Sequence, residues 1–230
     1  MKTKRLDHVK NHFNNEADIF DERVVKVVPY YKEMLEALVT AIPFPPGQPI
    51  KVADLGCGTG TVASLVKQRF PKARILCVDM SQNMLDTARK KLKGAKGADF
   101  ALAELGVYEF KGRYDAIVSS LALHHIIPGK DKTAVYKRIY SALKKGGIFV
   151  NADIIISKHK TIQGRYMKKW EKFVLESFSK EQARANYERY KREDRPCVLL
   201  EEMEVLKETG FRYVEVLWKY YNFATYCGIK

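Results

Sequence analysis

Long apolar segments and paired cysteines are both missing from this sequence of 230 residues. No apolar run approaches the ~20 residues that a membrane-spanning helix needs, so an integral membrane protein is not expected. The polar first twenty residues hold no signal-peptide core, which favours a cytoplasmic protein. No two cysteines form a CxxC pair, so neither a zinc clamp nor a redox dithiol is predicted. The four cysteines are Cys57, Cys77, Cys197 and Cys227.

Acidic residues are scarce beside basic ones. There are 27 Asp and Glu residues against 41 Lys and Arg residues, so the formal net charge is +14. The basic residues are spread along the chain and do not form one tail. A surplus of this size suits RNA or an anionic small molecule, and it equally suits an inert basic surface. RNA therefore stays open as a partner, and no membrane partner is expected.

Apolar, β-prone segments alternate with amphipathic ones after a proline-rich loop at residues 43–49. This alternation predicts βαβ units with helices on both faces of a parallel sheet. The predicted parallel strands are residues 50–55, 73–78, 98–103, 114–119 and 147–156. The predicted helices between them are residues 59–69, 81–92 and 132–143.

The segments that flank this pattern differ from it. Residues 1–45 predict an N-terminal helical segment, and residues 157–209 predict a charged, aromatic helical insertion over the active-site end. Residues 211–218 and 221–228 predict an antiparallel hairpin at the sheet edge. We therefore expect one doubly wound α/β domain over residues 1–230, with a seven-stranded, mostly parallel sheet.

A glycine-rich turn, DLGCGTG at residues 54–60, follows the first predicted strand. Gly56 and Gly58 permit a tight turn and let a ligand lie against the backbone, and Gly60 leads into the next helix. The spacing is GxGxG, whereas dinucleotide-binding folds carry GxGxxG. Asp54 stands two residues before the first glycine, where a carboxylate has an obvious partner in the ammonium of an amino-acid-bearing ligand.

The second predicted strand ends at Asp79, nineteen residues after Gly60. A carboxylate at this point can accept hydrogen bonds from both hydroxyls of a ribose. Its alternative role is to cap the next helix, although Ser81 is the better N-cap. Met80 and Met84 are placed either to flank an adenine or to pack in the core.

Taken in order, these motifs resemble the class I S-adenosylmethionine (SAM)-dependent methyltransferases. DLGCGTG is similar to the first motif of that family, and VDMSQNML at residues 78–85 is similar to the second. DAIVSSLALHH at residues 115–125 resembles the fourth motif, and LKKGGIFV at residues 143–150 resembles the turn into strand five. The resemblance covers about residues 50–155 and implies a Rossmann-like fold with SAM as cofactor.

The resemblance implies further cofactor contacts. Cys57 lies within the first motif and Ser120 within the fourth. Glu104 follows strand three, where the family usually has an Asp that accepts a hydrogen bond from the adenine amino group. Leu105 comes next, and both residues are assigned to the cofactor site.

Both ends of the chain resemble a narrower branch, carboxy-SAM synthase, an enzyme of tRNA wobble-uridine modification. The similar segments are FDERV at residues 20–24, VPYY at residues 28–31 and WKYYNF at residues 218–223. In that branch a tyrosine after the Val-Pro step contacts SAM, which implies this role for Tyr31. The branch also holds a ligand carboxylate with an arginine shortly before the final Gly-Phe. Val205 occupies that position here and cannot give a bidentate grip.

Candidate catalytic residues follow strands four and five. His124 and His125 come at the exit of strand four, facing the donor, where one of them can contact substrate or act as a base while the other packs. Neighbouring residues on a regular element point different ways, so no shared metal ion is predicted. Asp153 lies late in strand five and can orient a substrate. The aromatic residues between 166 and 190 either pack helices or surround the sulfonium.

The methyl group on a sulfonium is already electrophilic, so the reaction needs alignment of a nucleophile and no metal or covalent intermediate. We expect methyl transfer from SAM to a small molecule held under the insertion. Methyl transfer to tRNA or another RNA stays open because of the +14 charge. Modification of SAM itself also stays open, as does a homodimer built through the N-terminal helix and the insertion.

Overall fold

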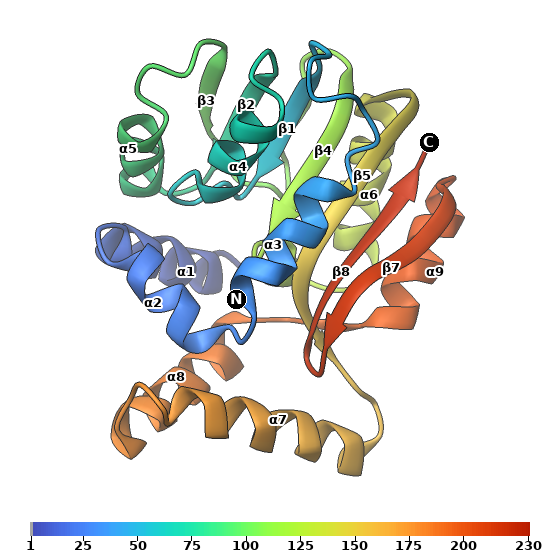
Figure 1. Cartoon of the computed structure of the whole chain (residues 1–230). Helices are drawn as coiled ribbons and strands as arrows, with labels where there is room; N and C mark the ends of the chain where they lie inside the picture. Colours follow the sequence, from blue (N-terminus) through green and yellow to red (C-terminus); the bar gives the residue numbers. More distant parts are fainter. Residues whose placement is uncertain (1) are drawn as a thin grey trace.

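The computed structural model describes residues 2–230, with side chains from Lys4 onward, and a sheet forms its centre (Figure 1). The main strand order is β3-β2-β1-β4-β5-β8-β7. The parallel strands are β1 Lys51–Leu55, β2 Arg74–Asp79, β3 Ala98–Leu102, β4 Tyr114–Ser120 and β5 Leu143–Ile156. The antiparallel strands at the edge are β7 Arg212–Tyr220 and β8 Phe223–Ile229.

The predicted α/β class, mostly parallel sheet and antiparallel C-terminal hairpin are therefore confirmed. The difference is an eighth strand, β6 Cys197–Val198, which pairs with the end of β5. Two residues in a charged helical region give no alternating pattern, and for this reason the sequence prediction contained only seven strands.

Helices cover both faces of the sheet. The helices α3 Tyr31–Thr40 and α4 Thr61–Arg69 cover one face, with α5 Gln82–Lys91 beside them, and α6 Lys130–Ala142 and α9 Leu199–Thr209 cover the other. Successive strand residues point to opposite faces. Val52 accordingly packs in the α3–α4 cluster, whereas Ala53 packs in the α6–α9 cluster.

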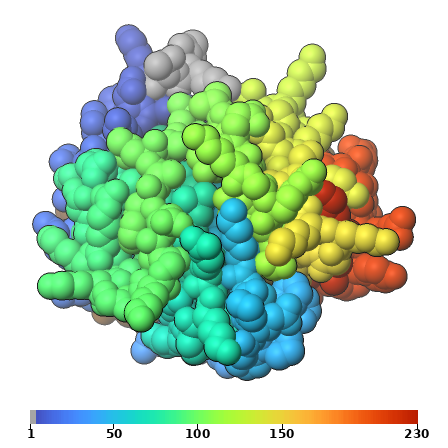
Figure 2. Space-filling model, turned by 90° about the horizontal axis from the view of Figure 1, so that it is seen from above, coloured from blue at the N-terminus to red at the C-terminus, as the bar shows by residue number. Residues whose placement is uncertain are grey.

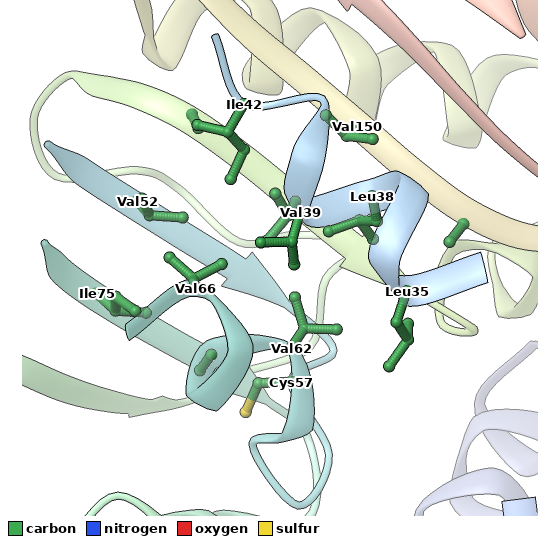
Figure 3. Packing of buried hydrophobic residues seen from close by; sticks show 14 of the residues in the cluster. Leu35, Leu38, Val39, Ile42, Val52, Cys57, Val62, Val66, Ile75 and Val150 are labelled. Atoms are coloured by element: carbon green, nitrogen blue, oxygen red, sulfur yellow. The ribbon is translucent and has the colours of Figure 1, made fainter. Parts of the chain in front are cut away.

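Figure 3 shows the first of these clusters at close range. Leu35, Leu38 and Val39 of α3 and Val62 and Val66 of α4 gather over the strand residues Val52, Ile75 and Val150. Each of these side chains is almost completely buried. This packing fixes α4 on the sheet and so fixes the glycine turn that precedes it.

The remaining helices lie at the carboxyl ends of the parallel strands, below the sheet in Figure 1. They are α1 Lys2–Glu16, α2 Phe20–Val27, α7 Lys160–Val174, α8 Lys180–Glu193 and the 3₁₀ turn η1 Leu123–His125. α1 packs on α5 and α8, and α2 packs on α7. The indole nitrogen of Trp170 donates a hydrogen bond to the Val27 carbonyl at 2.9 Å, which ties α7 to α2.

The predicted insertion therefore divides into two parts. Helices α7 and α8 lie over the carboxyl ends of the strands, whereas α9 packs on α6 and β7 at the face of the sheet. Over the described residues, no helix has both the length and the apolar character that a membrane crossing requires.

Candidate active site

A cavity lies where β1, β2 and β4 end, and α1 and α2 close it from the other side. Its unfilled space is about 1020 Å³, a volume that includes the open solvent at its mouth. Open α/β sheets bind their ligands at this carboxyl edge. Eleven of the predicted cofactor residues line the cavity: Tyr31, Asp54, Gly56, Cys57, Gly58, Asp79, Met80, Met84, Glu104, Leu105 and Ser120.

Gly60, the twelfth predicted cofactor residue, is not part of the cavity wall. It stands before α4 with φ +80°, and its amide donates to the Cys57 carbonyl at 2.9 Å. A Cβ added at Gly60 would lie 3.0 Å from the Ala88 Cβ. The glycine therefore allows α4 to approach α5 closely, which is a packing role.

The floor of the cavity is the glycine turn itself. Gly56 has φ +67°, and a Cβ built on it would lie only 2.2 Å from the Ala122 Cβ. The amides of Gly56 and Cys57 both donate to the Val78 carbonyl, at 2.8 and 3.1 Å. These bonds hold the turn against the end of β2 and keep bare backbone on the cavity side.

Asp54 is buried at the end of β1 with an unused acceptor. The side chain is 1% exposed, and Oδ2 has no hydrogen-bond partner in the described part of the chain. Burial raises the pKa of Asp54 to about 7; a hydrogen bond from the Ala63 amide opposes this shift, and the nearby Asp79 adds to it. An unpaired buried carboxylate oxygen is costly without a ligand. The ammonium of an amino acid fits this position.

Asp79 both braces the turn and borders the cavity. Its Oδ2 accepts a hydrogen bond from the Gly58 amide at 2.9 Å, and its Oδ1 accepts one from the Ser81 amide at 2.8 Å. Burial raises the pKa of Asp79, while these amide bonds lower it. The N-cap of α5 is Ser81, whose hydroxyl accepts from the Met84 amide at 3.2 Å. Ser81, and not Asp79, is therefore the N-cap of α5.

Residues of α1 form part of the cavity wall. Arg5, Leu6 and Phe13 line it, and the Arg5 guanidinium donates to the carbonyls of Glu193 and His125, at 2.6 Å each. The sequence prediction missed these residues because α1 carries no motif and is polar along most of its length. Only its docked position makes them part of the site.

Side-chain hydrogen bonds hold α1 in this position. Asn14 accepts a hydrogen bond from the Ser81 hydroxyl at 2.6 Å through Oδ1, and its carbonyl accepts one from the Asn83 amide group at 2.9 Å. The end of α1 is thereby attached to the first turn of α5, next to Asp79.

A second contact attaches α2 to the glycine turn. Asp21 Oδ1 accepts hydrogen bonds from the hydroxyls of Thr59 and Thr61, at 2.6 and 3.1 Å, and Oδ2 pairs with Lys91 at 2.5 Å. The hydrogen bonds from Lys91 and Thr59 lower the pKa of Asp21 against the opposing effect of burial. Asp21 belongs to the FDERV segment noted in the sequence, so this segment attaches α2 to the glycine turn.

His124 is buried beneath the cavity and does not line it. Its Nδ1 lies 2.5 Å from Asp153 Oδ1, and its Nε2 lies 3.5 Å from Asp194 Oδ1. Burial alone would lower the pKa of His124, but the two carboxylates outweigh it and raise the pKa to about 10. Asp153 is equally buried, 2% exposed, so both residues lie behind the wall of this cavity.

His125 does line the cavity, and it contacts Phe13 edge-on. Burial and the charge of His124 lower its pKa to about 3, so the ring is neutral. The expectation that the two histidines point apart was wrong: their ring centroids are 4.1 Å apart, and both rings face Asp194. The residues fall in the tight 3₁₀ turn η1, where the geometry of a regular helix or strand does not apply.

The ring nitrogens of this pair and the Asp194 carboxylate lie within 4.8 Å of one another, which is a spacing that could suit a cation. A protonated His124 already supplies a positive charge there, held between Asp153 and Asp194. The group is therefore accounted for as a buried ion pair.

A second hollow adjoins the cavity. Four residues line both spaces: Phe13, Phe20, Leu121 and His125. The hollow extends under α2 and the end of α8, between Val28, Ile154 and Arg189. Its unfilled space is about 640 Å³, again with the open solvent at its mouth included.

The chain matches known proteins over both its core and its full length. Residues 52–147 match a family model described as a methyltransferase domain. The carboxy-S-adenosyl-L-methionine synthase of a Nitratiruptor species is 31% identical over 93% of this chain and 90% of its own. The chain belongs to the carboxy-SAM synthase family. It is a class I SAM-dependent methyltransferase, and its cofactor is SAM.

Solved structures share the fold. DhpI in complex with SAH has a TM-score of 0.64 and 17% identity, over 95% of this chain and 93% of that one. Human N-acetylserotonin methyltransferase in complex with SAM has a TM-score of 0.60 and 16% identity, over 100% of this chain and 56% of that one. At these identities the likeness shows the fold alone.

Membership of the carboxy-SAM synthase family gives the departure at Val205 a structural context. Val205 lies on α9 and packs with the α6–α9 cluster, on the other face of the sheet. It does not line the cavity of its own chain. The valine therefore removes no group from this cavity, because its side chain lies away from the donor site.

Proposed function

We propose that the chain transfers the methyl group of SAM to a small molecule bound in the second hollow. The observation that carries the proposal is the position of this hollow, which meets the donor cavity at Leu121 and His125 and is covered by helices. Residues of α1, α2 and α8 form most of the wall around such an acceptor, and a hollow between helices favours a small molecule over an RNA chain. In this proposal the chain works as one domain, with α8 in the wall of the acceptor space and α7 packed behind α2.

The proposed donor contacts follow from the free acceptors in the wall. Asp54 Oδ2 receives the ammonium of the methionine part, because this oxygen has no protein partner within the described residues. Asp79 accepts hydrogen bonds from the ribose hydroxyls. Its oxygens already accept bonds from the Gly58 and Ser81 amides, and the carboxylate has further lone pairs for the ligand. Tyr31 borders the same cavity beside the methionine part.

The adenine end of the donor is assigned to the opposite wall. Met80, Met84 and Leu105 present polarizable or apolar surface to the cavity, and Glu104 offers a carboxylate for the adenine amino group. Cys57 and Ser120 complete the wall. Burial and the neighbouring Cys77 raise the pKa of Cys57 far above its usual range, so we assign it no nucleophilic role.

When bound, SAM supplies a methyl group that is already activated by its sulfonium. The protein then has to hold the acceptor in line and keep water out, which can contribute roughly 7–11 kcal/mol. We assign His125 to acceptor contact, since its neutral ring faces both spaces. His124, which also lines the second hollow, and Asp153 are assigned as positioning residues for it.

Loss of the ribose acceptor tests the donor site. We expect Asp79→Asn to weaken SAM binding at least tenfold in titration calorimetry, because it removes charge-assisted hydrogen bonds. Asp99→Asn is the matched control, since Asp99 is exposed at the far end of β3. Equal affinities of the Asp79 variant and the wild type would contradict the assignment.

A screen of metabolites for SAM turnover then tests the acceptor. Formation of adenosylhomocysteine with one small molecule, and none with bulk tRNA, is the expected outcome. Turnover that requires RNA would contradict the proposal.

Modification of SAM itself is the second candidate, favoured by family membership over nearly the whole chain and by the Arg5 guanidinium in the cavity wall. The two candidates differ in the mass of the nucleoside that stays bound during purification. A ligand heavier than SAM by a carboxylate would favour this candidate, and SAM or adenosylhomocysteine would favour methyl transfer.

A further inference from the structure

Much of the positive charge of the chain gathers at the end of the sheet that faces away from the cavity. This end is formed by four segments, residues 67–74, 93–99, 109–115 and 144–147, here called the basic edge. They contain ten Lys and Arg residues against three Asp and Glu residues, so they carry +7 of the formal +14. They precede or begin the parallel strands, whereas the cavity lies where the strands end.

Contacts show that the segments of the basic edge adjoin one another. Lys67 Nζ donates to the carbonyls of Pro71, Ala73 and Lys96, at 2.8 to 2.9 Å. The guanidinium of Arg113 donates to the Ser141 carbonyl, just before the fourth segment. Lys51, at the start of β1, joins the two pairs of segments, because it is in register with Arg74 and its amide donates to Asp115 Oδ2 at 2.7 Å. Figure 2 views this end of the molecule, with the light-blue chain near residue 50 between the green segments and the yellow one. The four segments therefore form one continuous surface.

Most charges on the basic edge are free to meet a partner. Eight of its ten cationic residues are exposed, the exceptions being Lys67 and Arg69. Asp115 is already neutralised by Lys144 at 2.8 Å. Within the described residues, Lys93, Lys96 and Lys145 form no ion pair.

The chemistry of this surface favours one class of partner. None of the large exposed apolar side chains of the described residues lies in the four segments, so nothing is available to insert into a membrane. Protein interfaces are depleted of Lys at their cores and depend on apolar contacts, which are also missing here. A surface of exposed Lys and Arg without apolar anchors matches a phosphodiester backbone, whose binding is almost purely electrostatic.

We propose that the basic edge binds the phosphate backbone of a nucleic acid. A strand bound there lies at the opposite end of the sheet from Asp54 and Asp79, so it is a binding partner and not the methyl acceptor. The inference does not depend on the proposed small-molecule reaction, because it uses none of the residues of the cavity or the second hollow.

The test measures binding of the full chain to a fluorescein-labelled single-stranded RNA by anisotropy at 50–200 mM salt. Lys93→Glu/Lys96→Glu reverses two exposed charges on the basic edge. Lys168→Glu/Lys172→Glu on α7 reverses two exposed charges elsewhere, so both variants have the same net charge. For single strands the salt slope is about −0.7 per phosphate contact, so we expect the edge variant to flatten the slope by about 1.4.

We also expect the edge variant to bind at least tenfold more weakly and the α7 variant to stay within threefold of the wild type. We expect SAM binding to stay unchanged in the edge variant. A loss of RNA binding with normal SAM binding is then due to the basic edge and not to damage at the donor site. A parallel titration with duplex DNA shows whether the basic edge prefers the phosphate backbone of RNA or that of DNA. Equal weakening by both variants, salt-independent binding, or tighter binding to vesicles with phosphatidylglycerol than to either nucleic acid would overturn the proposal.

Discussion

Asp54 is a carboxyl group of the cavity wall whose environment departs far from that of an ordinary carboxyl group. Its pKa is raised to about 7 because it is buried, and one of its oxygens has no protein partner. The folded protein therefore keeps a carboxylate that is only half ionised near neutral pH, at the position where the proposed ligand brings a positive charge. Ligand binding and ionisation are consequently linked.

This linkage predicts the pH dependence of SAM affinity. Below pH 7 the proton on Asp54 competes with the ligand, so affinity is expected to fall about tenfold per pH unit down to pH 5.5. Asp54→Asn is expected to bind more weakly and to lose this dependence. Calorimetric titrations of both proteins at several pH values measure it, and parallel curves would show that another group titrates.

The ion pairs of His124 predict how stability changes with pH. Its pKa is raised in the folded state to about 10, against about 6.5 in the unfolded chain, mainly by Asp153 and Asp194. The stabilisation of the fold by protonated His124 is therefore complete below pH 6.5 and is lost as the pH rises toward 10. Denaturant unfolding is expected to show His124→Gln as less stable than the wild type at pH 6.5, with the difference shrinking at pH 9–10. A constant difference would mean that His124 is not charged in the fold.

At the scale of elements, local patterns predicted most of the sheet. The five parallel strands agree with their predicted ranges within a few residues, because buried β-prone segments separated by helices leave little choice. The glycine turn and Asp79 were predictable for the same reason, since they follow strand ends directly. The sequence therefore predicted those residues of the site that stand at fixed positions in βαβ units.

The elements that cover the site were not predictable in the same way. Arg5 and Phe13 line the cavity because α1 docks on α5 and α8, where Asn14 bonds to Ser81, a residue far away in the sequence. The relation of His124 to His125 was misjudged because a 3₁₀ turn of three residues leaves no periodic signal. Long-range docking and short irregular turns set the limit of the sequence prediction.

The close approach of Gly56 to Ala122 in the glycine turn can be tested by substitution. Gly56→Ala would bring a Cβ to 2.2 Å from Ala122 in a residue with φ +67°. Overpacking costs about 1–3 kcal/mol, and the left-handed conformation of alanine costs about 1–2 kcal/mol more. We expect a corresponding fall in the free energy of unfolding, together with loss of SAM binding. Gly47→Ala is the control, since a Cβ there meets nothing within 4 Å; similar stability of both variants would contradict the geometry.

At the scale of the whole molecule, the helical cover is joined to the sheet at a few points. Asp194, just after α8, faces both histidines of η1, and the Arg195 amide donates to the His124 carbonyl at 2.8 Å. Trp170 attaches α7 to α2, and the bond from Arg23 to Asn186 attaches α8 to α2. A cover held mainly by side-chain contacts opens more readily than the hydrogen-bonded sheet beneath it.

Asp194→Asn is therefore expected to speed amide hydrogen exchange in α8 while leaving β1 and β4 unchanged. The reason is that the substitution removes one of the two carboxylates that pair with the His124 imidazolium. Glu188→Gln, which breaks an exposed pair with Lys191, is the matched control and is expected to change little. Faster exchange throughout the sheet would show that Asp194 supports the fold as a whole.

The second hollow has a consequence for how such a protein changes its chemistry. Only Leu121, His124 and His125 of its wall come from residues 52–147, the part that matches the general methyltransferase domain. The rest of the wall comes from the first two helices, the end of β5 and α8. A lineage can thus change these flanking segments, and with them the proposed acceptor, while Asp54, the glycine turn and Asp79 of the matched domain stay the same.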